Sequence, residues 1–343
     1  MLLQQCSLQH HAATLEENGY VLSDVGDLTS DDLKEMGIAK LKDRKAMLKA
    51  FAAHAEPSAA LGGGGGAAAA VAPVAPPGVG DLDKFIMPGA AIQLGTIEDA
   101  TRGIGFLLFG SGADQQLLAL ALEGVAAVER EFMQNGIDKD RSNYAKVRDG
   151  TLPDGKTLDA LMQHESTKVA ELQLHHVLAL RLYTTSSYRQ INSPMRTTPP
   201  TRPHPFAATA FFIFEAIKKL RTVEAKTASG MQPRTLWRGV SGLSLTKGFM
   251  ANGGTEFACM STTASPAIAA RFAKTGANPM LFKYETKNCI ERGADVAYLS
   301  AYQDEKEVLY PPLTYLRLSG VQEEVVAGVK LLVVHVDAQI VGN

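Results

Sequence analysis

The sequence predicts an α+β fold, in which a mainly helical part is followed by a part rich in strands. Apolar residues recur at helical spacing as far as about residue 222, and five short β-rich runs follow from residue 235. Helices and strands therefore do not alternate along the chain, and no GxGxxG motif is present. This order argues against a Rossmann dehydrogenase and predicts one sheet region with helices on one side.

A stretch of small residues divides the chain into two units. Residues 57–80, PSAALGGGGGAAAAVAPVAPPGVG, cannot bury enough apolar area to offset the entropy lost on ordering. The five glycines from Gly62 to Gly66 do not form a phosphate-binding loop, because no strand precedes them and no lysine follows. We therefore expect a flexible linker between a domain at residues 1–56 and a second domain at residues 81–343.

The first unit reads as short helices joined by tight turns. Thr29 or Ser30 can cap a helix that ends at Gly37, and another helix begins near Leu41. The segment LEENGYVLSDVGDLTSDDLKEMGIAKLKDRKAMLKA resembles a sterile alpha motif (SAM) domain whose first helix is shortened or missing. The resemblance implies self-association, or binding of another SAM protein, through an acidic and a basic surface.

Both surfaces can be found in the sequence. The residues concerned are Asp24, Asp27, Asp31 and Asp32 on the acidic side, and Lys40, Lys42, Arg44 and Lys45 on the basic side. The alternative is that these charges only solvate a small helical domain.

The composition excludes several classes of protein. A net charge of -2 gives no electrostatic reason to expect a nucleic-acid partner or an anionic membrane. Cys6, Cys259 and Cys289 are far apart and show no metal-ligand spacing, so we expect neither a disulfide framework nor a metal. The N-terminus does not resemble a signal peptide, and no apolar run reaches the ~18 residues of a membrane span. We therefore expect a soluble cytoplasmic protein.

Three helices are expected between the linker and the first strand. They cover residues 113–136, 165–185 and 204–221. The adjacent His175 and His176 point about a hundred degrees apart on the second of them, so both cannot ligate one metal from that helix. We expect them to be core or supporting histidines. The part from residue 81 to residue 230 is thus mainly helical, and residues 231–343 form a β-rich core.

Polar residues interrupt or end the predicted strands, which are TLWRGVS, TEFACMST, PMLFKYET, EVLYPPLTYLRL and KLLVVHV. The first strand places Arg238 in an apolar setting, where a buried guanidinium needs an anionic partner and suits phosphate. Gly239 leaves the backbone open to a ligand. FACMSTT ends in three hydroxyl side chains, which begin with Ser261.

The acidic segment YQDEKEVLYPP contains Glu305 and Glu307 two residues apart. If both lie on one strand, their carboxylates face the same way and repel each other. A fold keeps such a pair more readily when a cationic or hydroxyl-bearing ligand lies against it. The alternative for an acidic cluster is a solvated loop.

Taken together, four segments in order resemble the Arg-Ser-Glu class of ADP-ribosyltransferases. They are YRQINSPMR, LWRGV, FACMSTT and YQDEKEVLYPP, within residues 115–337. The third departs from the family pattern only at Thr263, which replaces a serine. The resemblance implies the family's fold, NAD as co-substrate and a protein acceptor.

The resemblance also implies a role for each site residue. Glu307 stabilises the positive charge that develops on the ribose, and Ser261 orients Glu307. Arg238 holds a phosphate, and Gly239 presents backbone groups to the nicotinamide. Further NAD contacts are implied for Tyr188, Asn192 and Phe272.

The region around Phe272 differs in one respect from the family pattern. Lys274 and Thr275 follow this phenylalanine, whereas some members have an arginine there that contacts a phosphate. For Phe272 itself, a position in the core is the alternative to an NAD contact.

The identity of residue 305, a glutamate, indicates which side chain accepts ADP-ribose. In the family a glutamate at this place goes with arginine acceptors, because a carboxylate pairs with a guanidinium in bidentate geometry. Tyr302 is implied to pack against the incoming protein. Two alternatives remain: an NAD glycohydrolase that uses the same residues, and a SAM scaffold whose second domain binds NAD without catalysis.

Overall fold

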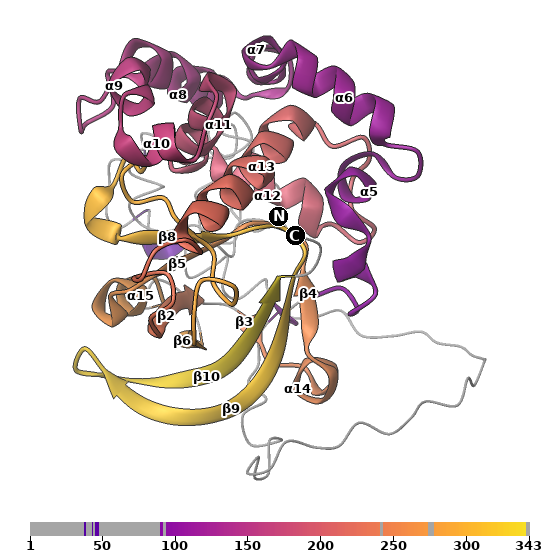
Figure 1. Cartoon of the computed structure of the whole chain (residues 1–343). Helices are drawn as coiled ribbons and strands as arrows, with labels where there is room; N and C mark the ends of the chain where they lie inside the picture. The colour runs from indigo at the N-terminus through magenta and orange to yellow at the C-terminus, as the bar shows by residue number, and fades with distance from the viewer. Residues whose placement is uncertain are drawn as a thin grey trace.

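The computed structural model describes residues 38, 43, 45–47, 90–91, 94–240, 243–273 and 278–340. Nearly all of the predicted first domain, the whole linker at residues 57–80, and Lys274 and Thr275 lie outside the described residues. The described residues consist of a helical part followed by a strand-rich part (Figure 1). The predicted α+β fold class is therefore confirmed.

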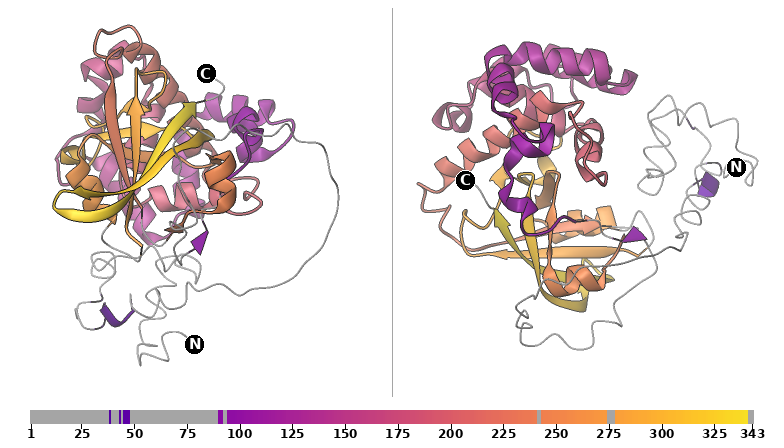
Figure 2. Two further views of the ribbon diagram at one scale, coloured as in Figure 1. Left: turned by 90° about the horizontal axis from the view of Figure 1, so that it is seen from below. Right: turned by 90° about the vertical axis from the view of Figure 1, so that its right-hand side faces the viewer.

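The helical part lies together on one side of the strands, as Figure 2 shows from two further directions. It is preceded by the short strand β1 (Ala90–Ala91) and the 3-10 helix η4 (Asp99–Thr101). Its helices are α5 (Gly103–Phe109), α6 (Asp114–Glu123), α7 (Val125–Asn135), α8 (Asp138–Asp149), α9 (Leu158–Met162), α10 (Glu165–Val169), α11 (Leu174–Tyr183), α12 (Tyr188–Arg196) and α13 (Ala207–Glu224).

Two of the three predicted helices are broken in the structure. The helix expected at residues 113–136 divides into α6 and α7 at Gly124, whose φ of 56° does not belong to an α-helix. The helix expected at residues 165–185 divides into α10 and α11, with Glu171 at a φ of 50° between them. Helical periodicity continues through both breaks, which is why the pattern did not reveal them.

Helices α5 and α6 form a bent, largely apolar pair. No residue of α6 is buried, and Leu118 and Leu122 are exposed on it. Among the described helices, none by itself has the length and hydropathy to cross a bilayer, and this pair, bent by 91°, meets those criteria jointly.

The strand-rich part forms an eight-stranded mixed sheet with the order β4-β9-β10-β6-β2-β5-β8-β7. A separate pair joins β1 to β3. Strand β10 lies between β9 and β6, antiparallel to the first and parallel to the second. The strands are β2 (Arg234–Val240), β3 (Leu243–Ser244), β4 (Gly254–Glu256), β5 (Met260–Thr263), β6 (Met280–Thr286), β7 (Ala294–Asp295), β8 (Glu307–Tyr310), β9 (Thr314–Val326) and β10 (Val329–Ile340).

Two short helices within the strand-rich part were not predicted. They are α14 (Lys247–Asn252) and α15 (Pro266–Ala273). Helix α15 packs through its alanines against Trp237, Leu281 and Val333 of three neighbouring strands. The expectation of helices on one side therefore holds for α5 to α13 but omits these two.

Buried apolar residues hold the two parts together. One core cluster joins the helices α11 and α13 to Leu299, Ala301 and Leu309, which lie in or before strand β8. A second lies within the sheet and includes Tyr284 and Tyr310. Since burial of apolar area is the main favourable contribution to folding, this shared core stabilises the helical part together with the end of the sheet at β7 and β8.

Candidate active site

The sheet is nearly split between β2 and β5. Strand β2 pairs with β6 along its whole length, but with β5 only where Trp237 faces Thr263. Strand β5 in turn pairs with β8, with Thr263 opposite Glu307. The three adjacent strands β2, β5 and β8 thus bring Arg238, Ser261 and Glu307 to the split.

Glu307 is buried, with 5% of its surface exposed. Burial raises its pKa to about 7, and the nearby charge of Glu305 acts in the same direction. A hydrogen bond from the Ser261 side chain and the charge of Arg238 oppose this rise in pKa. Ser261 therefore contacts the carboxylate that it was predicted to orient.

Arg238 is half-buried rather than buried, which corrects the sequence interpretation. Its Nη1 donates to the carbonyl oxygen of Ser261 at 3.2 Å, across the split. Its positive charge also acts to lower the pKa values of Glu256 and Glu307. Because part of this guanidinium is exposed, an anion that enters from solvent can bind to it.

Helix α15 packs so closely on β2 that only glycine fits at position 239. The backbone of Gly239 was predicted to be open to a ligand, but on the side where a Cβ would lie it is covered by α15. A Cβ at this position would lie 2.1 Å from the carbonyl oxygen of Ala269 and 2.7 Å from the nitrogen of Ala273. This close approach places Phe272 beside the split. Phe272 is 50% exposed, so the alternative of a core phenylalanine is excluded.

The acidic segment does not form one strand. Glu305 ends the 3-10 helix η5 (Gln303–Glu305), and Lys306 adopts a left-handed conformation with φ 48° before strand β8 begins at Glu307. The expectation that both carboxylates lie on one strand is therefore wrong, because this turn redirects the chain between them. The hydroxyl of Thr263 donates to the carbonyl oxygen of Glu305 at 2.6 Å and fixes the turn.

Glu305 is half-buried beside the site. Burial raises its pKa, and the charge of Arg271 on α15 opposes the rise. Tyr302, just before η5, is 52% exposed. This end of the site thus presents a carboxylate and an aromatic ring at the surface.

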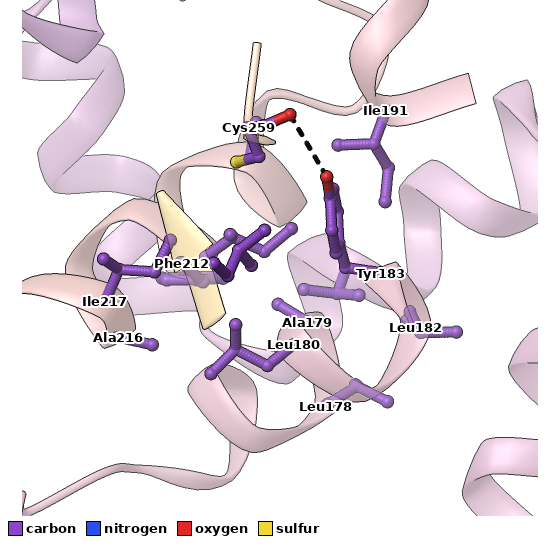
Figure 3. Packing of buried hydrophobic residues seen from close by; sticks show 14 of the residues in the cluster. Leu178, Ala179, Leu180, Leu182, Tyr183, Ile191, Phe212, Ala216, Ile217 and Cys259 are labelled. Carbon is purple, nitrogen blue, oxygen red and sulfur yellow. Dashed lines mark hydrogen bonds between the residues drawn. The ribbon is translucent and has the colours of Figure 1, made fainter. Parts of the chain in front are cut away.

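Helix α12 contacts the residue that directly precedes β5. The Nδ2 of Asn192 donates to the hydroxyl of Tyr183 at 3.1 Å and to the carbonyl oxygen of Cys259 at 3.3 Å. Tyr183 reaches the same carbonyl oxygen, as Figure 3 shows. The Oδ1 of Asn192 is buried and has no hydrogen-bond partner among the residues that the structure describes. Tyr188 begins the helix and is 40% exposed.

One pair at the site was missed by sequence reasoning. Arg196 of α12 binds Glu256 of β4 in bidentate geometry, at 2.9 and 3.1 Å. Although burial acts to raise it, the charge and hydrogen bond of Arg196 hold the pKa of Glu256 below its usual value. The signal was the position of Arg196, one helical turn after Asn192 in the motif YRQINSPMR.

The described residues contain no group of three or more His, Cys, Asp and Glu side chains that could hold a metal ion. His175 and His176 lie on α11 as predicted, with ring centroids 4.3 Å apart, and burial lowers both pKa values. They pack against Phe212 and lie in the helical core.

Family models identify both units of the chain. A model described as NAD:arginine ADP-ribosyltransferase matches residues 129–332, more than half of the chain. The chain belongs to this ADP-ribosyltransferase family. A model of the SAM domain matches residues 1–54, so the transferase domain follows an N-terminal SAM domain. No curated protein matches significantly in sequence.

Several solved structures resemble this ADP-ribosyltransferase. The eukaryotic mono-ADP-ribosyltransferase ART2.2 is 16% identical with a TM-score of 0.49, and the match covers 73% of this chain and 96% of that one. The ADP-ribosyltransferase HopU1 of Pseudomonas syringae pv. Tomato is 18% identical with a TM-score of 0.40, covering 58% and 97%. The type III effector XopAI from Xanthomonas axonopodis pv. citri is 12% identical with a TM-score of 0.40, covering 66% and 88%.

Proposed function

We propose that this protein transfers ADP-ribose from NAD to arginine side chains of acceptor proteins and releases nicotinamide. The observation that carries the proposal is the buried carboxylate of Glu307, which accepts a hydrogen bond from Ser261 and lies near Glu305 at the split in the sheet. Membership of the ADP-ribosyltransferase family supports the reaction class.

The chemistry follows from the charges at the split. When the bond between C1′ of the ribose and the nicotinamide nitrogen breaks, its electron pair leaves with nicotinamide and the ribose becomes an oxocarbenium-like cation. An ionised Glu307 stabilises that cation and accepts a hydrogen bond from the ribose 2′-hydroxyl. Burial strengthens this interaction, since little water screens it.

The remaining residues hold NAD. Arg238 binds a phosphate, and Asn192, whose buried Oδ1 has no hydrogen-bond partner among the described residues, contacts the dinucleotide. The half-exposed rings of Phe272 and Tyr188 pack against its flat groups. Backbone groups of Gly239 contact the nicotinamide carboxamide from the side that α15 leaves free.

Glu305 and Tyr302 receive the acceptor. The carboxylate of Glu305 aligns the guanidinium of the acceptor arginine, one nitrogen of which attacks C1′ and then loses a proton to Glu305 or to water. Tyr302 packs against the acceptor protein, consistent with its exposure beside Glu305.

Labelled NAD tests the proposal. The protein is incubated with NAD labelled in the adenosine part, with and without agmatine, a small guanidine acceptor. Transfer of label to agmatine supports the proposal. Release of nicotinamide with no labelled agmatine would support an NAD glycohydrolase instead. Binding of NAD without release of nicotinamide would support a SAM scaffold whose second domain binds NAD without catalysis.

A further inference from the structure

The residues that receive the acceptor are carried by a short turn, Tyr302 to Lys306, which we call the acceptor loop. The segment before it, Tyr298 to Ala301, is not part of the sheet. Its residues Leu299, Ser300 and Ala301 are nevertheless buried. Leu299 and Ala301 belong to the same core cluster as the helical part. The helical part therefore determines where the acceptor loop begins.

Arg181 of α11 makes the first link to this segment. It is 1% exposed, and its Nη1 donates to the carbonyl oxygen of Leu299 at 2.9 Å. Its Nη2 is paired with the carboxylate of Asp154. A buried guanidinium that is satisfied in this way is costly to displace, so it holds Leu299 at a fixed position.

Thr184, just after α11, makes the second link. Its hydroxyl donates to the carbonyl oxygen of Arg181 at 2.9 Å and accepts from the backbone nitrogen of Ala301 at 3.1 Å. The next residue after Ala301 is Tyr302, so this hydrogen bond fixes the residue directly before the acceptor loop.

Tyr298 adds a third link to the helical part. Its hydroxyl is 3.1 Å from that of Thr167, and its ring stacks on His164 with centroids 4.2 Å apart. Lys156 reaches its carbonyl oxygen at 3.4 Å. At the other end of the loop, Thr263 holds Glu305 as described above. The loop is thus fixed on both sides.

We propose that Arg181 and Thr184 are positioning residues that determine how well Glu305 aligns an acceptor arginine. They touch neither NAD nor the acceptor; they act by holding Leu299 and Ala301. With the loop held, Glu305 is already oriented when the guanidinium arrives, and with the loop released, water competes for C1′. This inference rests on the proposed function. It makes residues in and directly after α11 a determinant of the ratio of transfer to NAD hydrolysis.

Thr184→Val tests the clamp with a nearly isosteric change. The substitution removes the acceptor of the buried Ala301 nitrogen, which costs about as much as one buried hydrogen bond. We expect transfer to agmatine to fall about five- to tenfold relative to NAD hydrolysis. We also expect faster amide hydrogen exchange at residues 299–306. Thr184→Ser retains the hydroxyl and should restore both properties.

Two further variants complete the experiment. Thr286→Val also removes a buried hydroxyl, one that donates to the Arg234 carbonyl oxygen at 2.9 Å where the last residue of β6 faces the first of β2, and it should leave the ratio unchanged. Arg181→Lys keeps a positive charge beside Asp154 but cannot bind Asp154 and Leu299 with one planar fork. It should lower the ratio at least as far as Thr184→Val.

The outcomes separate the two proposals. If the wild-type chain transfers no label to agmatine, the proposed function fails, and this inference fails with it. If the wild type transfers label but folded Thr184→Val and Arg181→Lys keep its ratio, the clamp alone is refuted. Slow exchange at residues 299–306 in Thr184→Val likewise refutes the clamp. A lowered ratio with faster exchange, restored by Thr184→Ser, supports it.

Discussion

At the scale of single residues, the proposed function places two opposed requirements on Glu307. Stabilisation of an oxocarbenium-like cation needs an ionised carboxylate, whereas burial favours the protonated form and raises the pKa to about 7. The Ser261 hydrogen bond and the Arg238 charge offset part of this effect. The Glu307 carboxyl of the free protein therefore titrates at a higher pH than an ordinary glutamate does.

Glu307→Gln should abolish activity while it stabilises the fold at alkaline pH. Without the carboxylate, transfer and NAD hydrolysis should both fall on the order of 100-fold or more. Between pH 4.5 and about 7 the folded wild type keeps a proton that the unfolded chain releases, so its stability falls as pH rises. The glutamine variant avoids this loss, and its free energy of unfolding at pH 8 should exceed that of the wild type by on the order of 3 kcal/mol.

Kinetics and urea unfolding of both proteins at pH 5 and pH 8 check this prediction. Near-wild-type turnover in the folded variant would contradict the assignment of Glu307. An equal stability difference at the two pH values would contradict its raised pKa.

The same pKa should appear in the pH dependence of catalysis. Because kcat/KM for NAD reports ionisation in the free enzyme, it should rise with pH as Glu307 loses its proton and level off above about pH 7. Initial rates at low NAD concentration between pH 5 and 9 measure this. A profile that is already flat at pH 5 would mean that Glu307 ionises at its ordinary pKa.

Glu305→Gln should separate transfer from hydrolysis. Only alignment of the acceptor is lost, so transfer to agmatine should fall at least tenfold more than NAD hydrolysis does. Parallel assays of labelled agmatine and free nicotinamide give the two rates. Equal loss of both activities would assign Glu305 to the NAD chemistry instead.

At the scale of elements, α15 packs closely on β2, the strand on one side of the split. The helix approaches the strand so closely at Gly239 that its own backbone atoms occupy the place of a side chain. The same helix carries Phe272, which we propose as an NAD contact. A change in this packing distance should therefore alter NAD binding without touching a charged residue.

Gly239→Ala tests this contact. Because the nearest atoms belong to the backbone of α15, the helix must move, and we expect a loss of about 1–3 kcal/mol in stability together with a several-fold higher KM for NAD. Gly248→Ala in α14 is the matched control, since the nearest atom to its Cβ is 3.8 Å away. Thermal unfolding and NAD titrations compare the three proteins. An unchanged KM in Gly239→Ala would show that α15 can shift without affecting the site.

At the scale of the whole molecule, a SAM domain precedes a transferase domain whose helical and strand-rich parts share a buried core. The interaction surfaces proposed for the SAM domain lie almost entirely outside the described residues, so its association stays a prediction from sequence. If SAM domains pair, the linker at residues 57–80 tethers several active sites at high local concentration.

The full chain should therefore self-associate in a salt-dependent manner. Sedimentation velocity at low and high salt should show oligomers that weaken as ions screen the charges. The double variant Lys42→Glu, Arg44→Glu should shift the protein to the monomer. Lys146→Glu, Arg148→Glu, which makes the same charge change on the exposed side of α8, should not. A monomer under all conditions would mean that the basic residues only solvate the domain.

The strand-borne parts of the site could be predicted from sequence, because the segments LWRGV, FACMSTT and YQDEKEVLYPP resemble the motifs of the family. Their residues Arg238, Ser261 and Glu307 lie on the adjacent strands β2, β5 and β8. Features that depend on contacts between distant segments could not be predicted. The pair of Arg196 and Glu256 spans 60 residues of sequence, and the turn at Lys306 depends on Thr263.

Some predictions concern matters that the fold does not address. The domain boundaries, the cytoplasmic location and the acceptor stay predictions. The helix breaks at Gly124 and Glu171 were missed for a physical reason: each requires a positive φ, which apolar periodicity does not report. Glycine punctuation at Gly124 was visible in the sequence, but Glu171 carried no such signal.

The place of β10 in the sheet has a consequence for synthesis on the ribosome. This strand follows every other described strand in the sequence, yet it lies between β9 and β6. Until it has been made, β4 and β9 share no edge with the strands that carry the split, and the nascent chain holds two unconnected pieces of sheet. Folding of the transferase domain is therefore completed after translation of β10, so that a chain still in elongation does not yet have the finished sheet.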